Sequence, residues 1–179
     1  MIVRINEKVE KALRVAMGHV AHAEAEQIEP ALALLDDAER AEALALAIMV
    51  ASYVVVDVCG AKWPNDAAVR QIAEALATAG TTAKRLHLEA EQIYAYLSRA
   101  VFGRERLEDV ISDEPMITRL PVIVAQRAAV VYSPQEMDTW DYLDRIESAI
   151  EVAAALDASV LPAAVMLAYV PQPEGAGQE

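Results

Sequence analysis

The longest uncharged run of the chain lies between Glu42 and Asp57, where fourteen consecutive residues are apolar or neutral. The residues before it are rich in helix formers, Asp37 is suited to an N-cap, and Gly60 is suited to end a helix. The β-branched segment YVVVDV leaves a buried strand as the alternative. The pattern predicts a central helix over 38–59, apolar on all sides and buried in a helical bundle.

Apolar residues recur every three or four positions elsewhere, which predicts further helices. We expect long helices over 7–26, 66–79, 83–102 and 134–156, a short one starting at Pro30, and strongly apolar ones over 116–132 and 159–170. The fold predicted is therefore all-α, a single-domain helical bundle of seven or eight helices over residues 1–170. A disordered polar tail is expected at 171–179, and the polar stretch before Pro115 reads as a loop.

Capping residues place the expected helix boundaries. Asn6 is suited to cap the first helix, and Asn65 or Asp66 the one that begins there. Ser133 and Glu136 have the spacing of a capping box. Pro121 is expected to start or kink its helix because it lacks a backbone donor.

Composition narrows the class of protein. The 179 residues are 55% hydrophobic and only 5% aromatic, which favours helices, and the net charge of −13 makes nucleic acid an unlikely partner. A single cysteine, Cys59, excludes an internal disulfide and fits a cytoplasmic location. The uncharged run falls short of the roughly 20 residues that cross a membrane, so we expect no membrane partner.

The apolar segments predict association. A bundle of this size can bury one or two all-round apolar helices, and three are expected, over 38–59, 116–132 and 159–170. The remaining apolar face would need a partner. We therefore expect a homodimer formed through apolar helix faces, since two-fold symmetry is the usual solution for soluble oligomers. A different protein partner is also compatible with this pattern.

Candidate chemistry is sparse. His19 and His22 share a helix face with Glu26, but the Glu-x-x-His spacing of di-iron bundles is missing, so no metal and no cofactor is expected. Asp138, Asp141 and Asp144 recur every three residues. They could belong to an acidic-helix, Mg-dependent nucleotide hydrolase.

That hydrolase is our second alternative function. Glu39 and Glu42 have the Glu-x-x-Glu spacing of some all-helical nucleotide pyrophosphohydrolases, but a second motif on a neighbouring helix is missing. A solvated acidic face is the competing interpretation. No catalytic residue is assigned.

Residues 70–86 resemble a helix-turn-helix, within the region 66–90 that the resemblance assigns to DNA binding. The resemblance depends on the spacing of Ile72, Ala73, Leu76, Ala83 and Leu86. It implies a DNA-binding regulator, which is our first alternative function. In such a regulator the second helix has an N-cap residue, and its basic side chains face the DNA groove or the phosphates. The implied DNA-binding residues are Arg70, Thr82, Lys84, Arg85 and His87. An ordinary helical hairpin joined at Gly80 is the competing interpretation.

The function predicted from the sequence is therefore a non-catalytic helical interaction or accessory protein that acts as a homodimer.

Overall fold

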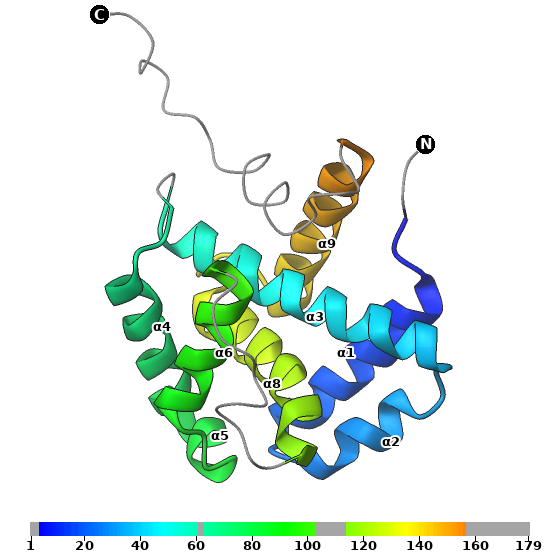
Figure 1. The fold of residues 1–179 in the computed structure, drawn as a ribbon, viewed down its shortest axis with the longest axis horizontal. Helices are drawn as coiled ribbons and strands as arrows, with labels where there is room; N and C mark the ends of the chain where they lie inside the picture. Colours follow the sequence, from blue (N-terminus) through cyan, green and yellow to red (C-terminus); the bar gives the residue numbers. More distant parts are fainter. Residues whose placement is uncertain (1–3, 61–62, 103–113, 157–179) are drawn as a thin grey trace, which may run out of the picture.

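The structure, a computed structural model, describes residues 4–60, 63–102 and 114–156. Within these residues it has eight α-helices, one 3-10 helix and no strand, so the expected all-α bundle is confirmed (Figure 1). The elements are α1 Glu7–Ala21, η1 Ala25–Gln27, α2 Ile28–Leu32, α3 Asp37–Val58, α4 Asp66–Thr78, α5 Gly80–Arg85, α6 Ala90–Phe102, α8 Glu114–Tyr132 and α9 Thr139–Leu156. The expected loop over 103–113, the helix over 159–170 and the tail over 171–179 lie outside the described residues.

The apolar run of the sequence forms α3, as predicted. Its N-cap is Asp36 rather than Asp37, because Asp36 accepts from the backbone N–H of Glu39 while the Glu39 carboxylate accepts from the N–H of Asp36. The N3 glutamate thus sets the start of the helix. At the other end, Gly60 has a φ of 67°, the left-handed conformation that lets the chain leave the helix.

The core lies mainly between α3 and α8. All residues from 50 to 56 on α3 and from 120 to 129 on α8 are buried. Figure 1 shows α3 crossing in front of α8, and the two helices make the largest interhelical contact in the described structure. α8 continues through Pro121 instead of starting there. Two strongly apolar helices therefore bury each other.

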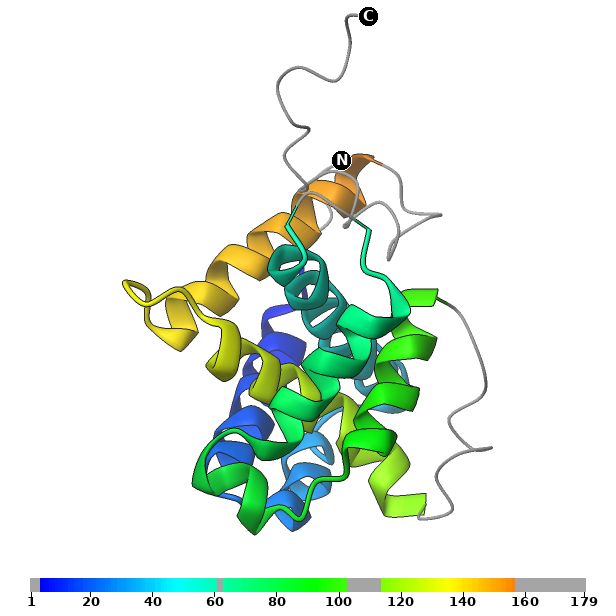
Figure 2. The same cartoon turned by 90° about the vertical axis from the view of Figure 1, so that its left-hand side faces the viewer.

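The other helices cover this pair from two sides. α1 and α2 lie on one side, α4, α5 and α6 on the other, and α9 projects obliquely at one end (Figures 1 and 2). The segment just before α1 is hydrogen-bonded to α9, because the N–H of Ile5 donates to the Glu151 carboxylate at 2.8 Å. Buried residues of α1, α2, α3, α4, α6, α8 and α9 belong to one hydrophobic cluster.

Four expected helix boundaries were wrong. The short helix expected to start at Pro30 begins at Ile28, so Pro30 lies inside its first turn. The helix expected over 7–26 ends at Ala21, where Ala23 takes a positive φ of 60°. The single helix expected over 83–102 is interrupted: α5 ends at Arg85, His87 has a φ of 51°, and α6 starts at Ala90. Residues 133–138 form a turn rather than a capping box, and the Asp138 carboxylate accepts from the N–H of Trp140 at 2.8 Å.

Within the described residues α3 is long and apolar enough to cross a membrane, as judged by length and composition. In its most apolar window, 56% of the residues are buried inside the bundle. The core helix of a globular protein passes the same test.

Candidate interaction surfaces

The first candidate surface is the more exposed side of α3. Ala41, Leu44, Ala45, Ile48 and Met49 follow one another at helical spacing along it. The two alanines are exposed and the three larger side chains are half-buried. We call these five residues the α3 outer face. No charged side chain interrupts α3 from Ala43 to Val56.

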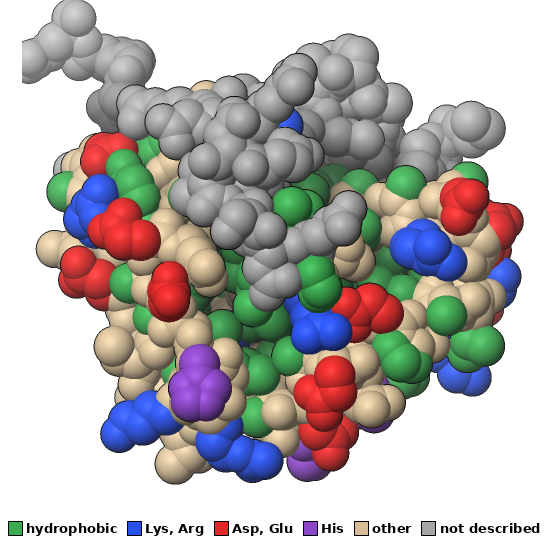
Figure 3. Space-filling view, turned by 60° about the horizontal axis from the view of Figure 1, so that its bottom comes forward, with side chains coloured by type: hydrophobic (Ala, Val, Ile, Leu, Met, Phe, Trp, Pro, Cys, Tyr) green, Lys and Arg blue, Asp and Glu red, His purple; other side chains and the backbone are tan. Residues whose placement is uncertain are grey.

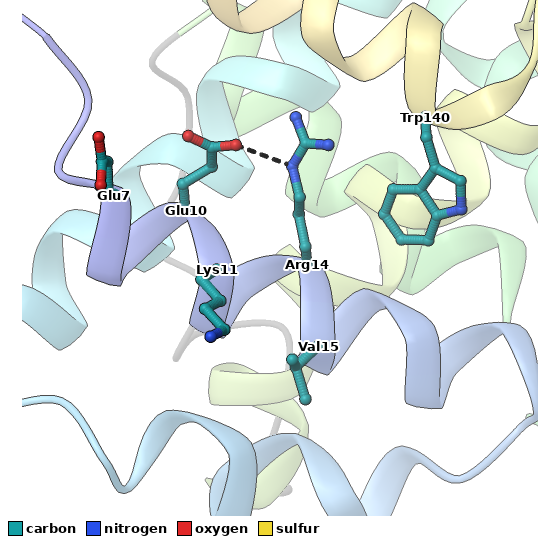
Figure 4. A pocket seen from close by; sticks show the side chains of 6 residues that line it. All are labelled: Glu7, Glu10, Lys11, Arg14, Val15 and Trp140. Atoms are coloured by element: carbon teal, nitrogen blue, oxygen red, sulfur yellow. Dashed lines mark ion pairs between the residues drawn. The ribbon is translucent and has the colours of Figure 1, made fainter.

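The second candidate surface is an open hollow between α1 and α9, with a volume of about 670 Å³. We call it the α1–α9 hollow. In Figure 4, Arg14 projects from α1 toward the indole ring of Trp140, which hangs from α9. Its lining residues are Glu7, Glu10, Lys11, Arg14, Val15 and Trp140.

The two apolar residues of the hollow are unusually exposed for their size. Trp140 is 42% exposed and Val15 is 48% exposed, although each belongs to a helix whose other apolar residues are largely buried. Trp140 stands three residues before Leu143 and six before Ile146, a spacing that puts all three on one side of an ideal helix. The structure buries Leu143 and Ile146 and leaves Trp140 at the surface.

Arg14 connects the two helices. Its Nη2 donates to the carboxylates of both Asp144 and Glu147 on α9, and its Nε lies 3.1 Å from Glu10 on its own helix. The guanidinium is also 6.0 Å from the centre of the Trp140 ring, within the range of a cation–π contact. One arginine therefore holds α9 against α1 and supports the tryptophan.

Glu147 is the buried member of this network, with only 7% of its surface exposed. Burial disfavours the charged carboxylate and raises the pKa of Glu147 to about 7. The hydrogen bond and charge of Arg14 oppose the shift, while the charges of Glu10 and Asp144 add to it. Glu147 comes three residues after Asp144 on α9, and its carboxylate accepts from Arg14.

The five residues expected to bind DNA lie on α4, on α5 and just after α5. Arg70 on α4 donates to Glu91 at 2.6 Å and stacks on the Tyr94 ring at 4.0 Å. Thr82 lies inside α5 rather than capping it, with its hydroxyl 3.5 Å from the Ala21 carbonyl. The remaining three, Lys84, Arg85 and His87, are exposed at the end of α5.

The recognition helix implied by the helix-turn-helix resemblance is therefore divided. α5 has six residues, and its basic residues lie in the last turn, where cations also stabilise the negative end of a helix. Figure 3 shows this end of the molecule, where histidine, lysine and arginine side chains lie along one edge with carboxylates beside them. DNA binding stays a prediction.

Each candidate metal ligand contacts a different group of the protein. His19 Nδ1 is 2.9 Å from Glu24, while His22 Nδ1 is 2.9 Å from the Gly18 carbonyl. Glu39 accepts from the backbone of Asp36 and from Lys8 at 2.5 Å. No group of three or more His, Cys, Asp or Glu side chains in the described part of the chain is placed to hold a metal ion. Residues 105–108, whose sequence ERLE repeats the Glu-x-x-Glu spacing, lie outside that part, so the hydrolase alternative stays a prediction.

No protein-family model matches this chain, and no curated protein or solved structure matches it as a relative.

Proposed function

We propose that this chain is a non-catalytic helical interaction protein that acts as a homodimer, and that the α3 outer face is the dimer contact. The observation that carries the proposal is the partly exposed apolar stripe on a helix that has no charge over most of its length. When a second surface covers apolar surface that was open to water, the free energy falls by roughly 25 cal/mol per Å² buried. A cytoplasmic location belongs to the same proposal.

A second copy suits this face for electrostatic reasons. The chain carries a net charge of −13, so two copies repel each other over most orientations. An uncharged helix face is the place where they can meet without bringing carboxylates together. Ala41 and Ala45 have small side chains, so two copies of α3 can approach closely across a two-fold axis.

The dimer is tested by light scattering in detergent-free buffer at micromolar concentration. We expect the wild-type chain to give twice the monomer mass of 19.4 kDa. Ala45→Glu should return the mass to 19.4 kDa, because it places a charge at the centre of the α3 outer face. Ala45 is exposed and glutamate is a good helix former, so the monomer should keep its fold.

Ala67→Glu is the matched control, since Ala67 is an exposed alanine of α4 and the substitution adds the same charge. It should leave the dimer intact. A wild-type mass of 19.4 kDa would contradict the proposal. Equal loss of the dimer in both variants would show that net charge, rather than the α3 outer face, controls association.

A further inference from the structure

We propose that the α1–α9 hollow is a second interaction surface, which binds a basic, amphipathic helical segment of a partner protein. This surface is separate from the α3 outer face and does not depend on the dimer. One apolar side chain of the segment packs against Trp140 and Val15, and its lysine or arginine side chains lie beside the carboxylates around the hollow.

The apolar contact comes from the supported tryptophan. The Arg14 guanidinium is 6.0 Å from the centre of the Trp140 ring and is itself paired with Glu10, Asp144 and Glu147, so a fixed cation lies beside the ring. A rigid aromatic side chain loses little conformational entropy on binding, and tryptophan is enriched among residues that dominate binding energy. The exposure of the ring is therefore suited to recognition.

The charge around the hollow selects the partner. Residues 7–15 of α1 and residues 138–147, at the start of α9, carry six carboxylates and four cations. The carboxylates are those of Glu7, Glu10, Asp138, Asp141, Asp144 and Glu147, and the cations are Lys8, Lys11, Arg14 and Arg145. Six negative and four positive charges leave an excess of two negative charges around the hollow, which favours a basic segment.

The same charges disfavour the other occupants. A two-fold contact places identical surfaces against each other, so a second copy here would bring two acidic rims together. A small apolar ligand would find an open hollow lined mostly by charged side chains instead of an enclosed apolar pocket. A helix with an apolar side and a basic side can contact both the indole of Trp140 and the carboxylates around the hollow.

The test uses Trp140 as the reporter. The chain contains two tryptophans, and Trp63→Phe leaves Trp140 as the sole one; Trp63 is itself exposed, which makes the replacement tolerable. The probe is a synthetic helical peptide of about four turns that carries leucine on one side and lysine on the other. We expect it to shift the Trp140 emission in a saturable manner. A peptide with glutamate in place of each lysine should cause no shift.

Two substitutions separate the hollow from general attraction to an acidic protein. With a fluorescently labelled peptide and anisotropy as the readout, Trp140→Ala should weaken binding about thirtyfold, as loss of a central aromatic contact does. Asp141→Lys should weaken it about tenfold by reversing a rim charge. The control is Glu74→Lys, the same charge reversal at an exposed position of α4, which should change affinity by less than about twofold.

The outcomes are distinct from those of the dimer test. Equal loss with Asp141→Lys and Glu74→Lys would show non-specific attraction and overturn the proposal. Equal binding of the glutamate peptide would also overturn it. If Trp140→Ala abolished the dimer measured by light scattering, the hollow would be the self-association surface and the basic partner would be wrong.

Discussion

The α3 outer face and the α1–α9 hollow both leave apolar side chains at the surface, but they differ in the charges around them. α3 has no ionisable side chain from Ala43 to Val56, whereas every lining residue of the hollow except Val15 and Trp140 is charged. Apolar exposure is therefore common to both regions and does not by itself indicate the partner. The surrounding charges decide whether a like or an opposite surface can approach.

The two regions also differ in how they are held. The α3 outer face depends on a helix whose inner side is packed against α8. The hollow depends on Arg14, which links α1 to α9 through Asp144 and Glu147. Substitutions of the charged side chains should therefore change the hollow and leave the α3 outer face unchanged. The largest expected effect comes first.

Arg14→Met should destabilise the protein most, because it leaves the buried Glu147 without its cation. Removing one partner of a fully buried ion pair costs roughly 3–5 kcal/mol. Asp144 and Arg14 are partly exposed, so we expect a loss of about 2 kcal/mol in the free energy of unfolding near pH 8. Urea denaturation measures it. The dimer mass should be unchanged, and a loss of dimer would remove the distinction between the two regions.

The same variant should lose less near pH 5, where Glu147 is protonated and no longer needs a cation. A loss that is as large at pH 5 as at pH 8 would contradict the role assigned to Glu147.

Glu147→Gln should flatten the dependence of stability on pH. The pKa of Glu147 in the folded protein is raised from 4.5 to about 7, so the folded state binds more protons than the unfolded state. Its contribution is fully present below pH 4.5 and is lost as pH rises through 7. After allowance for solvent screening, we expect about 1–2 kcal/mol to be lost over that interval in the wild type.

Chemical denaturation at several pH values measures the slope, and Glu147→Gln should show a smaller one. Asp144→Asn is the control: Asp144 is exposed and its charge is the smallest of the influences on the pKa of Glu147, so the slope should change much less than in Glu147→Gln. Parallel profiles for the wild type and Glu147→Gln would refute the assignment.

Salt should give the smallest effect and the sharpest contrast between the regions. Raising the ionic strength from about 0.05 to 0.5 M shortens the screening distance well below 10 Å. Binding of the basic peptide at the hollow should weaken about tenfold, while the dimer mass should not change. A dimer that dissociates as salt rises would show that charged groups, rather than the uncharged α3 outer face, hold it together.

Much of the local structure follows from the sequence. The run from Glu42 to Asp57 predicts a helix, and the observed bounds of Asp37–Val58 differ from the prediction by one residue at each end. Asn6 and Asn65 cap their helices as expected, each accepting from a backbone N–H. These features depend on residues within a few positions of one another, so the order of the residues is enough to predict them.

Other local features depend on which of several neighbouring residues forms the capping hydrogen bond. Asp36 and Asp37 are equally good caps, and the position of Glu39 decides between them. Ser133 and Asp138 both suit the start of α9, and the structure uses Asp138. The positive φ of His87, which separates α5 from α6, has no sequence signal of the kind that a glycine would give.

The sequence by itself determined that the chain is helical, where most of its helices lie, and that α3 is apolar on all sides. Only the tertiary structure decided which side of α3 faces outward, that Trp140 is exposed, and that Arg14 meets Glu147, 133 positions away. Helix formation depends on near neighbours, whereas exposure and ion pairing depend on how distant helices pack. That packing is a balance over the whole core, which no short pattern contains.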